Sequence, residues 1–93
     1  MNKAEKAHIA KVVESGCIVC VNLELGETPA EYHHTSNGML GKKSDNYSGI
    51  ALCHIHHRTG GYGVAIHAGR VQWESNFGTE QELLRQTMEW LNL

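Results

Sequence analysis

The first apolar stripe of the chain predicts a helix over residues 3–15. Asn2 precedes it as an N-cap, Glu5 lies at the third helical position, and Gly16 ends the run. The apolar residues recur at helical spacing, which indicates one face packed on a core. They are Ala4, Ile9, Val12 and Val13.

A second and clearer helix is predicted at the C-terminal end. Thr79 is a candidate N-cap, and Glu82 has the spacing of a capping box. The apolar residues predict a stripe that faces the core rather than a groove for a partner helix. They are Leu84, Met88 and Leu91, with Leu83 and Trp90 beside them. A shorter helix is predicted over residues 70–77, ending at Gly78.

Short apolar segments lie between these helices. Residues 30–35 and 49–52 are typical of strands, and a loop rich in Gly, Ser, Asn and Lys joins them. Residues 54–59 begin a further helix, which Gly60 and Gly61 break. Helices at both ends and strands between them predict a small α+β domain.

The composition is that of a single globular domain: 93 residues, 41% hydrophobic and 19% charged. A core this small stabilises a fold weakly, and such domains often contain disulfides or a metal. Three cysteines cannot complete a disulfide framework, and we find no secretory signal or long apolar run. We therefore predict a cytoplasmic protein, without membrane association, in which cysteine and histidine bind metal.

The cysteines and one histidine have the spacing of a closed zinc site. Two residues separate Cys17 from Cys20 in a predicted tight turn, and Cys53 and His56 repeat that spacing. Two such half-sites complete a tetrahedral Cys3His site, which suits structural Zn²⁺. His57 is also at an allowed spacing for the fourth ligand. Three buried free cysteines, or a redox pair, would also be compatible with the pattern.

An adjacent pair, His33 and His34, ends the first predicted strand. Neighbouring residues on a strand point to opposite faces, so one imidazole can bind a metal while its neighbour faces a water. If His56 binds the structural zinc, His57 is free to point to a second metal. For that reason we prefer His56 as the fourth zinc ligand.

The combined motif resembles the HNH endonucleases, and more narrowly the recombination-enhancement (Ref) nucleases of phages, which act with a RecA filament. The similarity runs from about residue 8 to the C-terminus and is densest in residues 52–69, LCHIHHRTGGYGVAIHAG. The run TPAEYHH, which contains His33 and His34, also matches. The resemblance implies a zinc-stapled ββα-metal (His-Me finger) core with flanking N- and C-terminal helices.

The resemblance also implies a function, the hydrolysis of DNA phosphodiester bonds by a phage or prophage endonuclease linked to recombination in a bacterial host cell. It assigns a catalytic metal to His33 and His57, with His67 as a third ligand or a phosphate contact. It assigns the general base to His34. Mg²⁺ is the metal implied by the family, and histidine ligands also accept zinc, nickel or manganese. DNA and a RecA filament are the implied partners.

The chain departs from the family pattern at the middle asparagine, which constrains the loop that orients the base. Ser48 occupies the usual position, and Asn46 is the nearest substitute. A net charge of −2 argues against a broad basic surface for DNA. We therefore expect local DNA contacts from Lys42, Lys43 and Arg58.

The predicted organisation is one nuclease domain over residues 1–93. Residues 1–16 form the N-terminal helix, residues 17–69 the zinc knuckles and the ββα-metal core, and residues 70–93 the C-terminal helices. The alternative function is a zinc-finger module that binds DNA or protein without catalysis.

Overall fold

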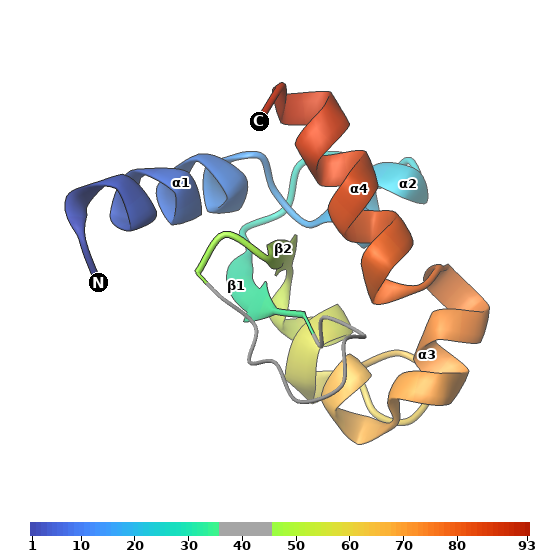
Figure 1. Ribbon diagram of the computed structural model, residues 1–93. Coiled ribbons are helices and arrows are strands. Elements are labelled where there is room, and N and C mark those ends of the chain that lie inside the picture. Colours follow the sequence, from blue (N-terminus) through green and yellow to red (C-terminus); the bar gives the residue numbers. More distant parts are fainter. Residues whose placement is uncertain (36–45) are drawn as a thin grey trace.

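The computed structural model describes residues 1–35 and 46–93 of the chain. These two ranges contain four α-helices, a two-stranded antiparallel sheet and two short helical turns, η1 and η2 (Figure 1). The elements are α1 (Lys3–Glu14), α2 (Ile18–Asn22), β1 (Glu31–His34), β2 (Gly49–Leu52), η1 (Ile55–Thr59), η2 (Ile66–Ala68), α3 (Arg70–Phe77) and α4 (Glu80–Leu91). The predicted α+β class is confirmed.

The sheet lies at the centre of the fold, with α1 on one side and α3 and α4 on the other (Figure 1). Every residue of β2 is buried, and β2 packs against α1, α2 and α4. The largest side chains of the core come from five different elements: Ile18, Val19, Ile50, Leu52, Ile66, Trp73 and Leu83. None of the helices within residues 1–35 and 46–93 is long and apolar enough to cross a membrane.

The terminal helices begin where the capping signals predict. At α1, Asn2 Oδ1 accepts a hydrogen bond from Glu5 N at 2.8 Å, and Glu5 Oε1 accepts one from Asn2 N at 2.9 Å. At α4, the Thr79 hydroxyl accepts a bond from Glu82 N at 3.1 Å. Residues 70–77, predicted as a short helix, form α3 with the same bounds.

One local prediction was wrong, and a second was right only in part. Residues 17–20 are not a tight turn, because Cys17 caps a short helix, α2, whose first turn closes with Val21 N donating to Cys17 O at 3.0 Å. In α4 the predicted stripe of Leu84, Met88 and Leu91 is half-buried, and Leu84 packs against the core. The fully buried side chains of this helix are instead Glu80, Leu83 and Thr87, while Trp90 is 49% exposed. The Thr87 hydroxyl donates to Leu83 O at 2.8 Å, which satisfies the buried polar group locally.

The register of the sheet separates the side chains of β1 into two groups. Glu31 pairs with Leu52 and His34 with Gly49. Because alternate residues share a face, Glu31 and His33 lie on one face and Tyr32 and His34 on the other. The Tyr32 ring lies so close to Gly49 that a Cβ there would be 2.2 Å from Tyr32 Cζ. Only glycine leaves room for this ring, and the tyrosine hydroxyl donates to Asn46 O at 2.8 Å.

Candidate metal centres

The four predicted zinc ligands meet in one buried cluster, here called the Cys3His cluster: Cys17, Cys20, Cys53 and His56. Their ligand atoms all lie within 4.8 Å of one another. His56 Nδ1 is 3.8, 3.6 and 3.2 Å from the sulfur atoms of Cys17, Cys20 and Cys53. The sulfurs of Cys20 and Cys53 are 3.8 Å apart. Four zinc-binding atoms therefore point to one centre.

The spacing and the chemistry of this cluster fit zinc. Tetrahedral Zn–S bonds of about 2.3 Å place two sulfurs about 3.8 Å apart, which agrees with the Cys20–Cys53 distance of 3.8 Å. Burial raises the pKa of the Cys17 thiol to about 12, and burial lowers the pKa of His56. A thiolate in this interior therefore requires a cation, while a neutral imidazole can bind one directly.

A second group of side chains, here called the histidine cluster, contains His33, His57 and His67. Their ligand atoms also lie within 4.8 Å of one another. His33 Nδ1 is 3.2 Å from His57 Nε2, and the ring centres of His57 and His67 are 4.3 Å apart. The cluster joins the end of β1, η1 and η2, which lie apart in the sequence.

Two carboxylates hold the first two rings of the histidine cluster. Glu80 Oε2 is 2.7 Å from His33 Nε2, and Glu31 Oε1 is 2.8 Å from His57 Nδ1. An ionised carboxylate can only accept, so each of these ring nitrogens must donate. In the neutral rings, His33 Nδ1 and His57 Nε2 then face each other with lone pairs. Two lone pairs at 3.2 Å attract a cation, and histidine ligands of metals are typically held in this way.

The surroundings of the histidine cluster shift the pKa values of Glu31 and His67. Hydrogen bonds from Arg58 and His57 lower the pKa of Glu31 to about 2, so this carboxylate is ionised at neutral pH. Desolvation and the neighbouring rings of His57 and His33 lower the pKa of His67, which favours its neutral, metal-binding form.

The turn η1 supplies a histidine to both clusters. Its backbone is a π-turn, in which Gly60 N donates to Ile55 O at 3.0 Å, a geometry frequent at functional sites. His56 points into the Cys3His cluster and His57 into the histidine cluster. The two clusters are therefore linked through one short element of the backbone.

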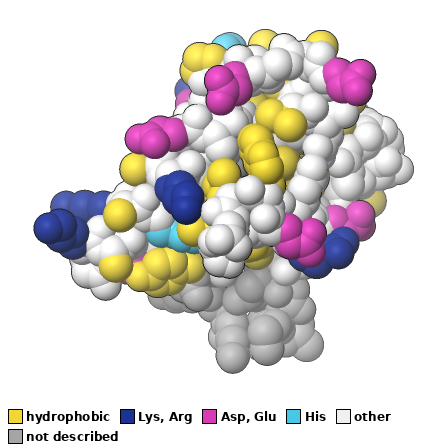
Figure 2. All heavy atoms as spheres, turned by 90° about the horizontal axis from the view of Figure 1, so that it is seen from above, with side chains coloured by type: hydrophobic (Ala, Val, Ile, Leu, Met, Phe, Trp, Pro, Cys, Tyr) yellow, Lys and Arg dark blue, Asp and Glu magenta, His cyan; other side chains and the backbone are white. Residues whose placement is uncertain are grey.

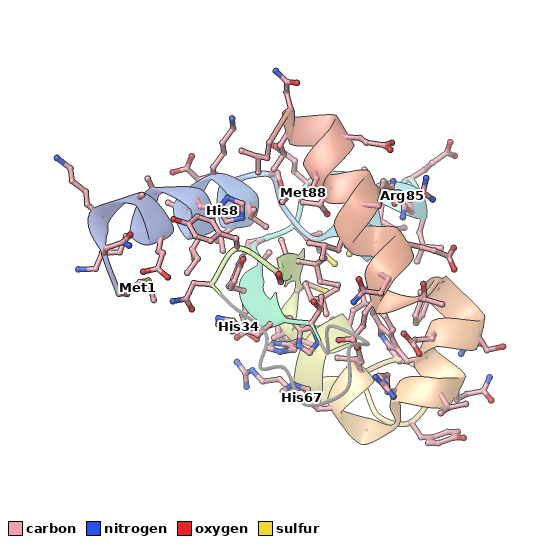
Figure 3. The ribbon with its side chains drawn as sticks, viewed as in Figure 1. Met1, His8, His34, His67, Arg85 and Met88 are labelled. Carbon is pink, nitrogen blue, oxygen red and sulfur yellow. The ribbon has the colours of Figure 1, made fainter. Side chains whose placement is uncertain are left out.

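His34 is outside the histidine cluster and lies on the opposite face of β1, beside Tyr32. Its Nε2 is 3.0 Å from Asn46 Oδ1, and Asn46 Nδ2 donates to Glu5 Oε2 at 2.9 Å. Because the amide nitrogen must face the Glu5 carboxylate, the amide oxygen faces His34. His34 Nε2 then donates, which leaves Nδ1 with a lone pair for a proton. Figure 3 labels His34 near β1 and His67 below it in the view.

The remaining predicted site residues have separate outcomes. Lys42 and Lys43 lie outside the described residues. Arg58 donates to Glu31 through both Nε and Nη2, and its contact with DNA stays a prediction. Two further histidines lie outside both clusters. His54 is exposed, and its Nδ1 is 2.9 Å from the hydroxyl oxygen of Thr59, while the His8 ring packs edge-on against Tyr47.

Three glutamates of the site were missed by sequence analysis: Glu5, Glu31 and Glu80. Glu31 had a usable signal, since it lies two residues before His33 on a predicted strand and so shares its face. Glu5 and Glu80 had no such signal in the sequence. Each lies in the first turn of a helix, where an acidic residue is already explained by capping or by the helix dipole.

Replacement of Asn46 by alanine is expected to release the His34 ring. The wild-type ring should be the Nε2–H tautomer at neutral pH, whereas the variant should show a mixture of tautomers because its acceptor is lost. Two-bond ¹H–¹⁵N correlation spectra separate these states. His54 is the internal control, because its partner, Thr59, is untouched. A wild-type His34 protonated at Nδ1 would contradict the assignment.

The comparisons with known proteins assign no family. A scan against protein-family models finds no match, and a search of curated proteins finds no similar sequence.

The charged side chains of the described residues are not sorted by sign over the surface of the protein. On the face seen in Figure 2, basic and acidic side chains are interspersed, and those of the described residues form no continuous basic stripe.

Proposed function

We propose that this protein is a metal-dependent DNA endonuclease of the HNH type with a ββα-metal core formed by β1, β2 and η1. The single observation that carries the proposal is the histidine cluster, whose member His33 is followed along β1 by His34. Three imidazoles converge on one point, two of them are oriented by carboxylates, and the next residue along β1 is an exposed histidine with a free Nδ1 lone pair. Its zinc site is the Cys3His cluster.

The metal required by the proposal fits the residues of the histidine cluster. A bound divalent cation would neutralise charge on a phosphate and stabilise the leaving 3′ oxygen of a DNA strand. His33, His57 and His67 would hold it, and Mg²⁺ or Mn²⁺ is the expected ion. His33 and His57 are each only 11% exposed in their side chains, which keeps them oriented.

His34 supplies the proton acceptor. It is covalently next to His33, so its Cα lies about 3.8 Å from that of a metal ligand. It is exposed, so a water and a phosphate can reach it. Imidazole accepts a proton near neutral pH, and Asn46 leaves His34 Nδ1 free to do so. We therefore assign His34 as the general base and Asn46 as the residue that orients it.

The substrate and setting are part of the proposal. The Ref-like motif favours DNA, a phage or prophage origin and action with a RecA filament. With a net charge of −2, the chain lacks the overall positive charge that would attract DNA from solution. Delivery of DNA by a protein filament would remove that difficulty. The cytoplasm of a bacterial host is the corresponding location.

Nicking of supercoiled plasmid tests the proposal. Protein with zinc in the Cys3His cluster is expected to relax the plasmid when Mg²⁺ or Mn²⁺ is added, with or without a RecA filament. His57→Ala should abolish nicking, because it removes a ligand of the histidine cluster, whereas the exposed His54→Ala should not. Folded wild-type protein that binds DNA but never nicks it, under either condition, would favour the zinc-finger module without catalysis.

A further inference from the structure

We propose that Glu80 is a positioning residue for the metal of the histidine cluster. Its carboxylate holds His33 in the tautomer that offers Nδ1 to the ion. The inference rests on the proposed function, because it takes the histidine cluster to be a metal site. It adds a requirement that neither the motif nor the sequence pattern contains, namely a residue of the last helix.

The position of Glu80 is set by the start of α4. It is the first residue of the helix, its side chain is 3% exposed, and its backbone N–H donates to Glu74 Oε2 at 2.8 Å. The N-terminus of a helix favours a negative side chain. Arg70 Nη1 lies 3.4 Å from Oε1, on the other oxygen from the one that meets His33. The carboxylate is therefore held from two sides.

Burial of this carboxylate against His33 has a chemical consequence. A buried carboxylate needs partners, and the second oxygen of Glu80 takes the Nε2–H of His33 at 2.7 Å. The His33 ring can then neither flip nor move its proton to Nδ1 without breaking that bond. Nδ1 stays 3.2 Å from His57 Nε2, on the side where the three imidazoles converge. Carboxylate partners also make an imidazole a stronger ligand.

The metal affinity of the histidine cluster therefore depends on the docking of α4. Of the groups that hold His33 and His57, Glu31 comes from β1 itself, whereas Glu80 comes from the last helix of the chain. Loss of Glu80 should loosen one ligand without removing it.

Calorimetric titration with Mn²⁺ and with Ni²⁺, after the Cys3His cluster has been loaded with zinc, tests this inference. Wild type should bind one further ion. Glu80→Gln keeps the shape of the side chain but lets its amide donate to His33 Nε2, which permits the wrong tautomer. We expect its dissociation constant to be about 10–100-fold higher. Glu89→Gln, on the same helix and 71% exposed, is the matched control and should bind as wild type does.

The possible results distinguish a failure of this inference from a failure of the proposed function. Wild type that binds no further ion overturns the metal site and with it the proposed function. If wild type binds the ion, and a folded Glu80→Gln variant binds it equally well, the inference alone is overturned. A purely structural role predicts that last result, with a lower thermal midpoint and unchanged affinity.

A measurement on the wild-type protein keeps the inference testable if Glu80→Gln does not fold. Two-bond ¹H–¹⁵N spectra of the zinc-loaded protein, without the further ion, should show His33 as a single tautomer protonated at Nε2. Protonation at Nδ1, or exchange between the two tautomers, contradicts the role assigned to Glu80.

Discussion

Replacement of Cys53 by alanine is expected to unfold the domain. The side chain supplies one of four ligand atoms around a single buried centre, and its loss leaves three ligands for an ion that prefers four. Zinc binding to a structural site contributes about 10–16 kcal/mol at pH 7 in zinc-finger peptides. A small domain has a total stability of only about 5–15 kcal/mol. The loss of a large part of the zinc-binding free energy is therefore comparable with the total stability of the domain.

The measurement is the dispersion of the amide NMR spectrum together with the near-ultraviolet circular dichroism. His54→Ala changes the next residue along the chain, which is exposed and outside both clusters, and should leave both signals intact. Chelation of zinc from the wild-type protein should reproduce the effect of Cys53→Ala, and return of zinc should reverse it. A Cys53→Ala protein with a native spectrum and no bound zinc would show that the core is sufficient alone.

Replacement of His34 by alanine is expected to lower the rate of plasmid nicking about 10²–10⁴-fold, as for loss of a positioned general base. The variant should still bind zinc and a further divalent ion, because His34 belongs to neither cluster. His34→Ala should therefore lower the catalytic rate and leave the metal affinity unchanged. Glu80→Gln, in contrast, should lower the metal affinity. Single-turnover nicking at saturating Mn²⁺ measures the rate directly.

The comparison with two other variants makes the His34 result specific. His54→Ala should nick as fast as wild type, and Asn46→Ala should fall between wild type and His34→Ala, since its base is present but poorly oriented. Nicking by His34→Ala at the wild-type rate would remove the proposed mechanism, even if the protein remained a nuclease.

The elements that could be predicted from the sequence were those with signals within a few residues. The caps at Asn2 and Thr79 and the helix over residues 70–77 depend on neighbours in the chain, and the structure contains them. The Cys3His cluster was predictable for a related reason. Each half-site spans only four residues, so only the meeting of the two half-sites had to be inferred.

The parts that were missed depend on distant neighbours. The burial of Glu80 and the exposure of Trp90 follow from how α4 is rotated against the rest of the core, including β2, which no local periodicity fixes. The carboxylate that holds His33 lies on the last helix, so no spacing motif could contain it. The contact between Asn46 and Glu5 likewise joins α1 to the residues before β2.

The alternation of side chains along β1 has a consequence for changes in chain length. A single inserted or deleted residue within Glu31–His34 would turn the strand over, because every side chain exchanges faces when the register slips by one. His33 would then leave the face that holds its contacts with His57 and Glu80, and His34 would leave its contact with Asn46. Homologues that preserve the chemistry should therefore keep the length of this strand as strictly as they keep its two histidines.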